Sequence, residues 1–259
     1  MDENLLQGNV KEFLEEKYDQ YCRPEFIDTD PIQIPHMFAN PHDIEISGFL
    51  AATIAWGQRP TIIANARRLI TMMGNRPYEF IMSANETSLC PFLEFKHRTF
   101  NGQDTIHFIK TLQHIYRNKG GLKSVFEKPY KKRKNIRDSL IHFREVFFEI
   151  PHLSRTEKHV ANILRNASAK RLNMFLRWMV RQDKRGIDFG IWQDIDPANL
   201  HIPLDLHTGN VSRKLQLLSR KQNDWKAVEE LTGVLRKIDP SDPIKYDYAL
   251  FGLGIFEGF

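Results

Sequence analysis

Residues 155–181 read RTEKHVANILRNASAKRLNMFLRWMVR. One helical face of the second half is apolar, and it carries Leu172, Phe175, Leu176, Met179 and Val180. This spacing predicts an amphipathic helix over 170–181. Residues 155–165 have a similar spacing, which predicts another helix before it. The stretch as a whole therefore predicts two helices joined by a short hairpin.

The hairpin residues Asn166, Ala167, Ser168 and Ala169 lie between these two predicted helices. A tight hairpin needs a residue that tolerates positive φ, and Asn166 is the best choice other than glycine. We expect Ser168 to cap the second helix, whose first backbone N–H groups could then hold an anion. Together with Arg171, the hairpin is predicted to grip a DNA phosphate without reading sequence.

Helical periodicity dominates the rest of the chain, and no convincing series of alternating strands is present. Pro60 suits the first turn of a helix, and Gly74 suits its end. Similar apolar spacing predicts further helices over 46–54, 60–73, 105–118, 135–149 and 224–238. The predicted fold class is all-α.

The chain has 259 residues and a mass of 30.4 kDa, enough for one large domain or two closely packed lobes. Hydrophobic residues make up 41% and charged residues 27%, which is ordinary for a globular protein. No apolar run has the length needed to cross a bilayer, and the acidic N-terminal stretch lacks the features of a secretory signal. We therefore expect a cytoplasmic protein with no membrane partner.

Charge and cysteine content narrow the range of partners. The net charge of +5, with a pI near 9.1, suits a nucleic-acid partner. The two cysteines, Cys22 and Cys90, could on their own hold neither a zinc ion nor an iron–sulfur cluster. We expect no cofactor and no metal.

The segment KPYKKRKNIR, residues 128–137, contains six basic residues and is the best candidate for an exposed connection. One interpretation is a solvated surface segment, which is what basic runs usually are. The other interpretation is a patch that contacts phosphates. The sequence leaves both open.

A second informative stretch is HIPLDLHTGNVSRKLQLL, residues 201–218. Asp205 precedes a predicted helix whose apolar face includes Val211, Leu215 and Leu218. An aspartate at that place can cap the helix. It can also be the carboxylate of an active site, and the two roles are compatible.

The chain thus has a helix, a hairpin, a second helix that begins with Lys170, and then an aspartate before another helix. This order resembles the helix-hairpin-helix DNA glycosylase superfamily, which includes endonuclease III and the 8-oxoguanine glycosylases. PLDLHTGNVSRKLQL is similar to the superfamily's P-V-D-T-H-V-x-R-V-x-x-R-L block, with matching places at Asp205, His207, Val211 and Leu215. AATIAWGQRPTIIANARRLI, residues 51–70, is similar to its early L-S-Q-Q-T helix pair, with Gln58 at the polar turn. ALFGLG, residues 249–254, stands where the superfamily has its closing helix.

The chain departs from the superfamily pattern in three ways. Asn166-x-Ser168 replaces the usual Gly-x-Gly of the hairpin. Lys170 and Asp205 are 35 residues apart, more than in endonuclease III and similar to the archaeal 8-oxoguanine glycosylases. No cysteine follows Cys90, so the four-cysteine cluster loop of endonuclease III is absent. The resemblance therefore points to a bacterial branch of the superfamily, closest in layout to the archaeal enzymes.

The resemblance implies a two-lobed all-α fold over residues 1–259, with a helix-hairpin-helix element at about 155–181 and the active site in the cleft between the lobes. It also implies a DNA glycosylase with AP lyase activity, which cleaves the strand at the abasic site. The partner would be double-stranded DNA containing a damaged base, bound by a monomer associated with the nucleoid. The archaeal layout makes 8-oxoguanine the favoured base.

The resemblance makes Lys170 the nucleophile and Asp205 the catalytic carboxylate. A neutral lysine amine can attack C1′ and form a Schiff base, which then permits strand cleavage. Breaking the N-glycosidic bond builds positive charge on the sugar, which a nearby carboxylate stabilises. Taken alone, Lys170 would be interpreted as a surface lysine, and Arg171, Arg177 and Lys184 compete with it for the role.

Recognition of an extruded base needs a flat partner and hydrogen bonds to the base edge. The candidates are Trp56, Trp178, Phe189 and Trp192. Trp178 lies close to the apolar face of its predicted helix, which favours packing in the core over contact with a base. Gln58, next to Arg59 at the polar turn, could fill the gap left by the extruded nucleotide or simply end a helix.

Two other functions stay open. A protein with this fold could bind or sense damaged DNA without catalysis, and the altered hairpin favours that possibility. His201, Asp205 and His207 could bind a metal and serve a metal-dependent nuclease. The nuclease would lose its activity in EDTA, whereas the glycosylase would not.

Overall fold

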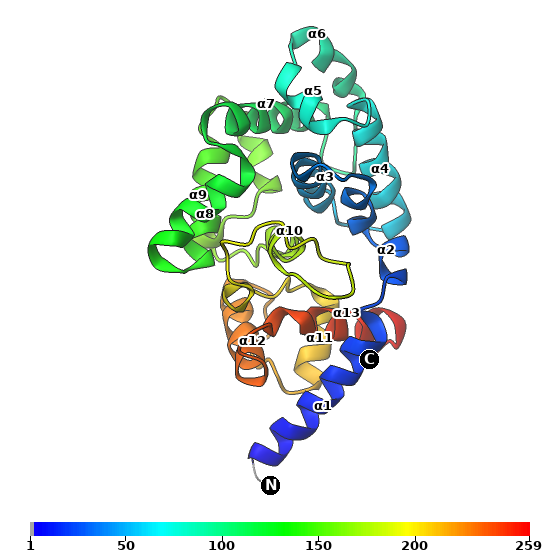
Figure 1. The fold of residues 1–259 in the computed structure, drawn as a ribbon, viewed down its shortest axis with the longest axis vertical. Helices are drawn as coiled ribbons and strands as arrows, with labels where there is room; N and C mark the ends of the chain where they lie inside the picture. The colour runs from blue at the N-terminus through cyan, green and yellow to red at the C-terminus, as the bar shows by residue number, and fades with distance from the viewer. Residues whose placement is uncertain (1–2) are drawn as a thin grey trace. The chain divides into compact units, whose positions relative to one another are not determined.

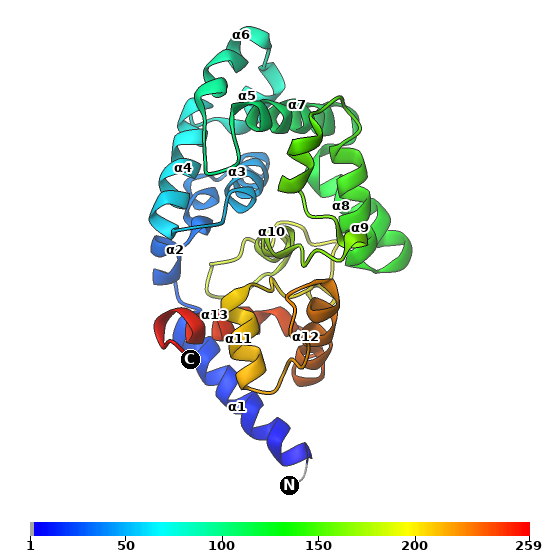
Figure 2. The ribbon, with the colours of Figure 1, turned by 180° about the vertical axis from the view of Figure 1, so that it is seen from behind.

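The computed structural model describes residues 3–259, with side chains from residue 9 onward. Within that range the chain has no β-strand, only three isolated β-bridges, which confirms the predicted all-α class. No helix in the same range is long and apolar enough to span a membrane. The chain divides into two compact units (Figure 1, Figure 2). We call residues 27–162 the middle unit, and the chain up to Phe26 together with residues 163–259 the terminal unit.

The middle unit consists of helices and short 3₁₀ turns. α2 (Glu25–Thr29) leads into it from the terminal unit. Its further α-helices are α3 (Pro41–Thr53), α4 (Arg59–Met72), α5 (Pro77–Ser83), α6 (Glu86–Leu89), α7 (Gly102–Asn118), α8 (Gly121–Arg133) and α9 (Ile136–Phe147). The 3₁₀ turns are η1 (Pro31–Gln33), η2 (Pro35–Met37), η3 (Cys90–Glu94) and η4 (Ser154–His159). The helices predicted over 46–54, 60–73, 105–118 and 135–149 are confirmed.

Local sequence explains where several of these helices begin and end. The Asn40 side chain caps α3, and Pro41 follows at the first helical position. Asn101 and Asp104 form a capping box at the start of α7. After α4, Gly74 takes the left-handed conformation, with a φ of 68°, as its position in the sequence predicts.

α3 is a buried helix that holds α7 and α9 together. Every residue of α3 from Ile44 to Thr53 is buried. The Phe49 ring of α3 contacts Phe108 of α7 and both Phe143 and Phe147 of α9, with ring centroids 5.5 to 5.9 Å apart. Aromatic contacts of this geometry add to the stabilisation that burial of the rings already gives.

The terminal unit is also helical. Its α-helices are α1 (Glu3–Tyr21), α10 (Lys170–Val180), α11 (Leu206–Lys214), α12 (Trp225–Ile238) and α13 (Tyr246–Phe256). Its 3₁₀ turns are η5 (Ile163–Arg165), η6 (Pro197–Asn199) and η7 (Pro243–Lys245). The helices predicted over 170–181 and 224–238, and the helix predicted after Asp205, are confirmed.

α13 packs against both α1 and α11 at two glycines. Gly252 faces Tyr21 of α1 so closely that a Cβ atom there would overlap the tyrosine ring. A Cβ atom on Gly254 would lie 3.0 Å from the Cβ of His207 on α11. The absence of a side chain at these two positions therefore lets both helices approach α13.

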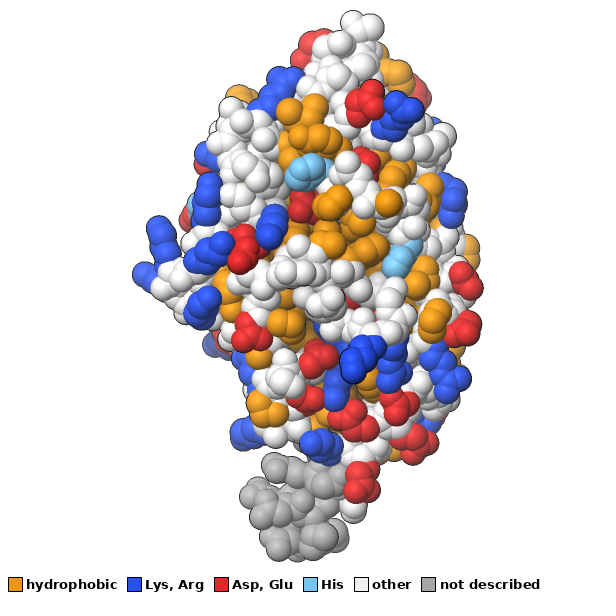
Figure 3. Space-filling view, in the orientation of Figure 1, with side chains coloured by type: hydrophobic (Ala, Val, Ile, Leu, Met, Phe, Trp, Pro, Cys, Tyr) orange, Lys and Arg blue, Asp and Glu red, His pale blue; other side chains and the backbone are white. Residues whose placement is uncertain are grey.

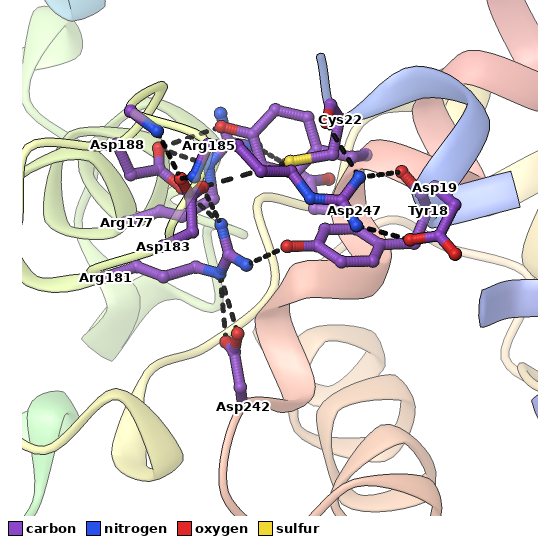
Figure 4. Close-up of polar contacts among 12 residues, drawn as sticks. Tyr18, Asp19, Cys22, Arg177, Arg181, Asp183, Arg185, Asp188, Asp242 and Asp247 are labelled. Atoms are coloured by element: carbon purple, nitrogen blue, oxygen red, sulfur yellow. Dashed lines mark hydrogen bonds and ion pairs between the residues drawn. The ribbon is translucent and has the colours of Figure 1, made fainter. Parts of the chain in front are cut away.

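Two arginines near the C-terminal end of α10 are buried in an ion-pair network (Figure 4). Arg177 is 4% exposed and pairs with Asp247 of α13 and, at 3.4 Å, with Asp188. Arg181 is 1% exposed. Its partners, at 2.6 to 2.9 Å, are Asp183, Asp188, Asp242 and the hydroxyl of Tyr18 on α1. The network ties α1, α10 and α13 together.

The helix predicted over 155–165 is wrong, so the helix-hairpin-helix element predicted at about 155–181 keeps only its second helix, α10. That stretch forms the 3₁₀ turns η4 and η5, and the boundary between the two units falls between residues 162 and 163. The Thr156 hydroxyl donates to the buried Asp104 carboxylate at 2.7 Å, far away along the chain. This side-chain contact with the start of α7 overrides the helical spacing of the local sequence.

The exposed connection predicted at 128–137 is wrong in part. α8 continues to Arg133, Lys134 takes the left-handed conformation with a φ of 52°, and α9 begins at Ile136. The basic side chains from 131 to 134 are nevertheless exposed. The segment is therefore the exposed end of a helix rather than a loop.

Replacing Arg181 by methionine should destabilise the protein strongly. The change removes the cation that Asp183, Asp188 and Asp242 share, and breaking a buried ion pair costs about 3–5 kcal/mol. Urea-induced unfolding at pH 7 measures the loss. Arg76→Met is the matched control, because the Arg76–Glu79 pair is 75% and 69% exposed and should contribute less than about 0.5 kcal/mol. Equal losses in the two variants would contradict this account of the network.

Candidate functional site

The side chains of Lys170 and Asp205 meet in the terminal unit. Lys170 is the first residue of α10, and Asp205 is the N-cap residue of α11. Lys170 Nζ lies 3.5 Å from Asp205 Oδ2. The two side chains are 28% and 18% exposed, so a ligand can reach them. The structure therefore brings together the two residues that the sequence predicts to be catalytic.

The two oxygens of the Asp205 carboxylate have different contacts. Oδ1 accepts the backbone N–H of Thr208 at 2.9 Å and so caps α11, while Oδ2 faces Lys170. The Asp205 backbone carbonyl accepts hydrogen bonds from Asn223 Nδ2 and from the N–H of Gly209, both at 2.9 Å. The carboxylate is thus held in place by its capping role and still presents one oxygen to the lysine.

The turn that precedes α10 is held against the start of α12. Asn166 has a φ of 62°, as predicted, and Ala169 also has a positive φ, of 52°. Asn166 Nδ2 donates to Asp224 at 2.7 Å, and the Asn166 carbonyl accepts the Trp225 N–H at 3.1 Å. Asp224 itself caps α12, and its hydrogen bonds with Arg220 hold the pKa of this carboxyl well below its usual range. These contacts fix the turn.

Ser168 does not cap α10, contrary to the prediction. The left-handed Ala169 takes the N-cap place instead, and it offers no side chain for a capping hydrogen bond. The Ser168 carbonyl accepts Asn173 Nδ2 at 3.2 Å. The first turn of α10 therefore keeps backbone N–H groups that an anion could accept. Arg171 in that turn is half-buried, and burial lowers its pKa to about 10, so the side chain stays charged at neutral pH.

A buried carboxylate is electrostatically coupled to the lysine–aspartate pair. Asp247, in the first turn of α13, is 5% exposed and pairs with Arg177. Burial raises the pKa of Asp247 to about 6, Arg177 opposes this shift, and the charge of Asp205 adds to it. Lys170 acts on the same group in the opposite sense to Asp205. Sequence analysis missed Asp247, although a lone acidic residue within the apolar run 246–253 is a signal of a buried charge.

Two buried polar atoms near the pair have no hydrogen-bond partner among residues 9–259. They are Asn173 Oδ1 on α10 and Thr208 Oγ1 on α11. The two residues are 1% and 0% exposed. Asn173 lies one helical turn after Lys170, and Thr208 lies one turn after Asp205. A buried polar atom without a partner costs about 1–3 kcal/mol, which a bound polar group or water could recover.

The other basic residues considered for the nucleophile are placed differently. Arg177 is buried in ion pairs with Asp188 and Asp247, which is a structural role. Lys184 is exposed in the loop that follows α10. Neither position resembles that of Lys170, which stands at a helix start with its amine against a half-buried carboxylate.

Two of the predicted base-recognition residues lie in the core instead. Trp178 and Trp192 are each 0% exposed, and the Trp192 ring packs edge-on against Phe175 with centroids 5.4 Å apart. The prediction is wrong for both, because a ring enclosed by the core cannot stack on a base. The apolar face of α10 is the signal that places Trp178 in the core. Phe189 is half-buried, and its backbone N–H donates to the Trp178 carbonyl at 2.8 Å.

Trp56, Gln58 and Arg59 belong to the middle unit. The Trp56 ring is half-buried, stacked on His159 at 5.9 Å and edge-on to His97 at 4.9 Å. Gln58 is exposed at the N-cap position of α4, and its side chain makes no capping hydrogen bond. Arg59 is the first residue of α4. Their assignment as DNA contacts stays a prediction.

Residues 30–256 match the model of one protein family, DUF2400, whose description is a protein of unknown function. The chain belongs to this family. The matched range includes Lys170, Asp205 and Asp247. No curated protein and no solved structure matches the chain. Membership of the family therefore assigns no activity to the chain.

The histidines of the proposed metal trio are in unlike surroundings. His201 is 8% exposed beside the Trp225 ring, and burial lowers its pKa to about 3. His207 is exposed on α11. In the described part of the chain, no three His, Cys, Asp or Glu side chains gather closely enough to hold a metal ion. His201 is a neutral core histidine.

Proposed function

We propose that this protein is a DNA glycosylase with AP lyase activity, in which Lys170 is the nucleophile and Asp205 the catalytic carboxylate. One observation carries the proposal: Lys170 Nζ lies 3.5 Å from Asp205 Oδ2, at the starts of two separate helices. A lysine amine beside a fixed, partly exposed carboxylate suits nucleophilic attack at C1′ of a sugar. The resemblance of the surrounding sequence blocks to the helix-hairpin-helix glycosylases supports the same assignment.

The two residues have complementary roles in the proposed reaction. Cleavage of the N-glycosidic bond releases the base with the bonding electron pair and leaves positive charge on the sugar, which the Asp205 carboxylate stabilises. The neutral Lys170 amine attacks C1′, and the proton it must lose can pass to Asp205 Oδ2. The sugar ring then opens: the C1′–O4′ bond breaks, O4′ takes a proton, and C1′ and Lys170 Nζ form the Schiff base. Loss of a proton from C2′ then eliminates the 3′ phosphate, which cleaves the strand.

The proposed partner is double-stranded DNA, with 8-oxoguanine as the favoured lesion. By the resemblance to the glycosylases, the 166–169 turn and the first turn of α10 would hold a backbone phosphate, with Arg171 beside them. Left-handed Asn166 and Ala169, together with the uncapped start of α10, support this grip. We place the protein in the nucleoid as a monomer.

Three residues of the middle unit, Trp56, Gln58 and Arg59, stay proposed contacts with the DNA. Trp56 is half-buried, so part of its ring could stack on a base. Gln58 is exposed at the N-cap position of α4 and could enter the space that an extruded nucleotide leaves, and the half-buried Arg59 beside it is proposed as a further DNA contact. The unpartnered Asn173 Oδ1 and Thr208 Oγ1 are candidates for polar contact with the substrate or with ordered water.

The first experiment is a panel of lesion-containing duplexes incubated with the protein in EDTA, with borohydride present to trap a Schiff base. Excision and trapping in EDTA would support the proposal. Binding to a lesion without cleavage would support a non-catalytic damage sensor instead. Cleavage that disappears in EDTA would support a metal-dependent nuclease.

Lys170→Ala should lose strand cleavage and the trapped covalent adduct, by roughly a hundredfold or more, because the attacking amine is gone. Lys170→Gln should still bind lesion DNA, since it leaves the backbone N–H groups of the first turn of α10 and the Arg171 side chain in place for the phosphate. Gel analysis of borohydride-treated reactions measures both the adduct and the cleaved strand. Lys184→Ala is the matched control and should keep wild-type rates. An adduct that persists in Lys170→Ala would show that another amine is the nucleophile.

Asp205→Asn should reduce base excision by roughly a hundredfold or more, because it removes the charge that stabilises the sugar cation. Its melting temperature should stay within a few degrees of wild type, since asparagine caps a helix about as well as aspartate. Single-turnover kinetics measure the loss of base excision, and thermal unfolding measures the melting temperature. Asp196→Asn, at the N-cap of η6, is the control and should leave excision unchanged. Normal excision by Asp205→Asn would reduce Asp205 to a helix cap.

The exposed basic end of α8 should bind DNA phosphates without lesion preference. Figure 3 shows Lys and Arg side chains gathered where α8 ends, and Lys131 to Lys134 are exposed. Neutralising Lys131 and Lys132 should weaken damaged and undamaged duplexes alike and flatten the plot of log affinity against log salt by about 0.9 per lost phosphate contact. Neutralising Arg76 and Lys96, exposed elsewhere in the middle unit, is the control. Equal slopes in the two double variants would make the segment an ordinary solvated surface.

A further inference from the structure

Asp247 connects the buried ion-pair network to the candidate site through two helices. Its carboxylate pairs with Arg177 of α10, and Arg177 follows Lys170 by seven residues, which is two turns along the same helical face. α13 packs against α11, the helix that Asp205 caps, where Gly254 meets His207. Asp247 therefore lies on α13, pairs with α10, which carries Lys170, and belongs to the helix that packs against α11, which Asp205 caps.

The charges that act on Asp247 come from α10, from the start of α11 and from the loop after α10. Arg177 and Lys170 on α10 favour its ionised form, whereas Asp205 at the start of α11 and Asp188 in the loop after α10 oppose it. Burial opposes ionisation as well, and it is the largest influence. The outcome is a pKa of about 6, so the carboxylate is mostly ionised at pH 7.5 and mostly protonated at pH 5.

We propose that Asp247 is a positioning residue for the Lys170–Asp205 pair. The buried negative charge of Asp247 stabilises the positive charge that forms at the pair during the reaction. The electrostatic part rests on the ion pair of Asp247 with Arg177 of α10 and on the packing of α13 against α11. The catalytic part rests on the proposed glycosylase function. In that reaction, positive charge appears first on the sugar and then on the Schiff base at Lys170 Nζ. Protonation of Asp247 removes a charge that stabilises both.

The coupling predicts reciprocal shifts that can be measured without any substrate. Removing the Asp205 charge should lower the Asp247 midpoint by about half a pH unit or more, since a nearby like charge raises a carboxyl pKa. Removing the Lys170 charge should raise the midpoint, because Lys170 favours the ionised carboxylate. Linkage requires that the effects be mutual.

The measurement is an NMR titration of protein labelled with ¹³C at the aspartate carboxyl carbons. The Asp247 signal is assigned by its absence in Asp247→Asn, and its midpoint is followed in wild type, Asp205→Asn and Lys170→Met. If Asp247→Asn fails to fold, Asp247→Glu provides the assignment in the same way, because glutamate carries no label and the Asp247 signal is absent. Asp242 is the internal control, because it lies in the same network, but the charges that act on it are Arg181, Asp188 and Lys245. A midpoint for Asp247 that moves in neither variant would overturn the proposal.

The pH dependence of base excision shows whether Asp247 is a positioning residue or has a purely structural role. Wild-type base excision should fall by about threefold to tenfold from pH 7.5 to pH 5, with an inflection near pH 6. Asp247→Asn should lose this inflection and be slow at both pH values. Asp242→Asn, which also removes a carboxylate partner of a buried arginine, should keep the inflection. If both variants keep it, Asp247 has no role in the reaction beyond holding Arg177.

The two arms distinguish failure of this inference from failure of the proposed function. Coupled NMR midpoints in a protein that excises no base would overturn the glycosylase proposal and leave the electrostatic coupling supported. An active glycosylase whose Asp247 midpoint ignores Asp205 and Lys170 would overturn the coupling and leave the function supported.

Discussion

The terminal unit depends on two buried, charged arginines, Arg177 in α10 and Arg181 directly after it. A buried guanidinium that lost its carboxylates would cost several kcal/mol, so every element that supplies a partner is held at one depth and one rotation. α13 supplies Asp247 and α1 supplies the Tyr18 hydroxyl. Apolar contacts tolerate small slides between helices, whereas hydrogen-bonded ion pairs do not, because their strength falls steeply with poor geometry. Arg177 and Arg181 thus set the register of the helices around them.

This constraint reaches the candidate site through the rigidity of α10. With Arg177 fixed, the face of α10 that carries Lys170 is fixed as well, two turns earlier. Asp205 is held independently by its cap on α11 and by Asn223, which donates to its backbone carbonyl. The 3.5 Å separation of Lys170 and Asp205 therefore follows from supported helix starts rather than from a flexible loop. Supported geometry of this kind is what a reacting pair requires.

The sequence predicted those features of the fold that depend on neighbouring residues alone. Periodicity placed most helices, and the conformational tolerance of asparagine placed the left-handed Asn166. Pattern failed at 155–165, where a hydrogen bond from Thr156 to Asp104, 52 residues away, replaces a helix with 3₁₀ turns. The resemblance to the sequence blocks of the helix-hairpin-helix glycosylases predicted that Lys170 and Asp205 act in one site. Asp247 was missed because its importance lies in partners on other helices, which no local spacing records.

The balance of charge in the network bears on the chemistry that the site can support. Arg177 and Arg181 pair with four carboxylates, of Asp183, Asp188, Asp242 and Asp247, and burial raises the pKa of both Asp242 and Asp247. An interior with more carboxylates than cations favours any new positive charge formed at its edge, and Lys170 stands at that edge. Glycosidic cleavage and Schiff-base formation both create positive charge there. Hydrolysis of a phosphodiester would instead bring negative charge to the same place, which these carboxylates oppose.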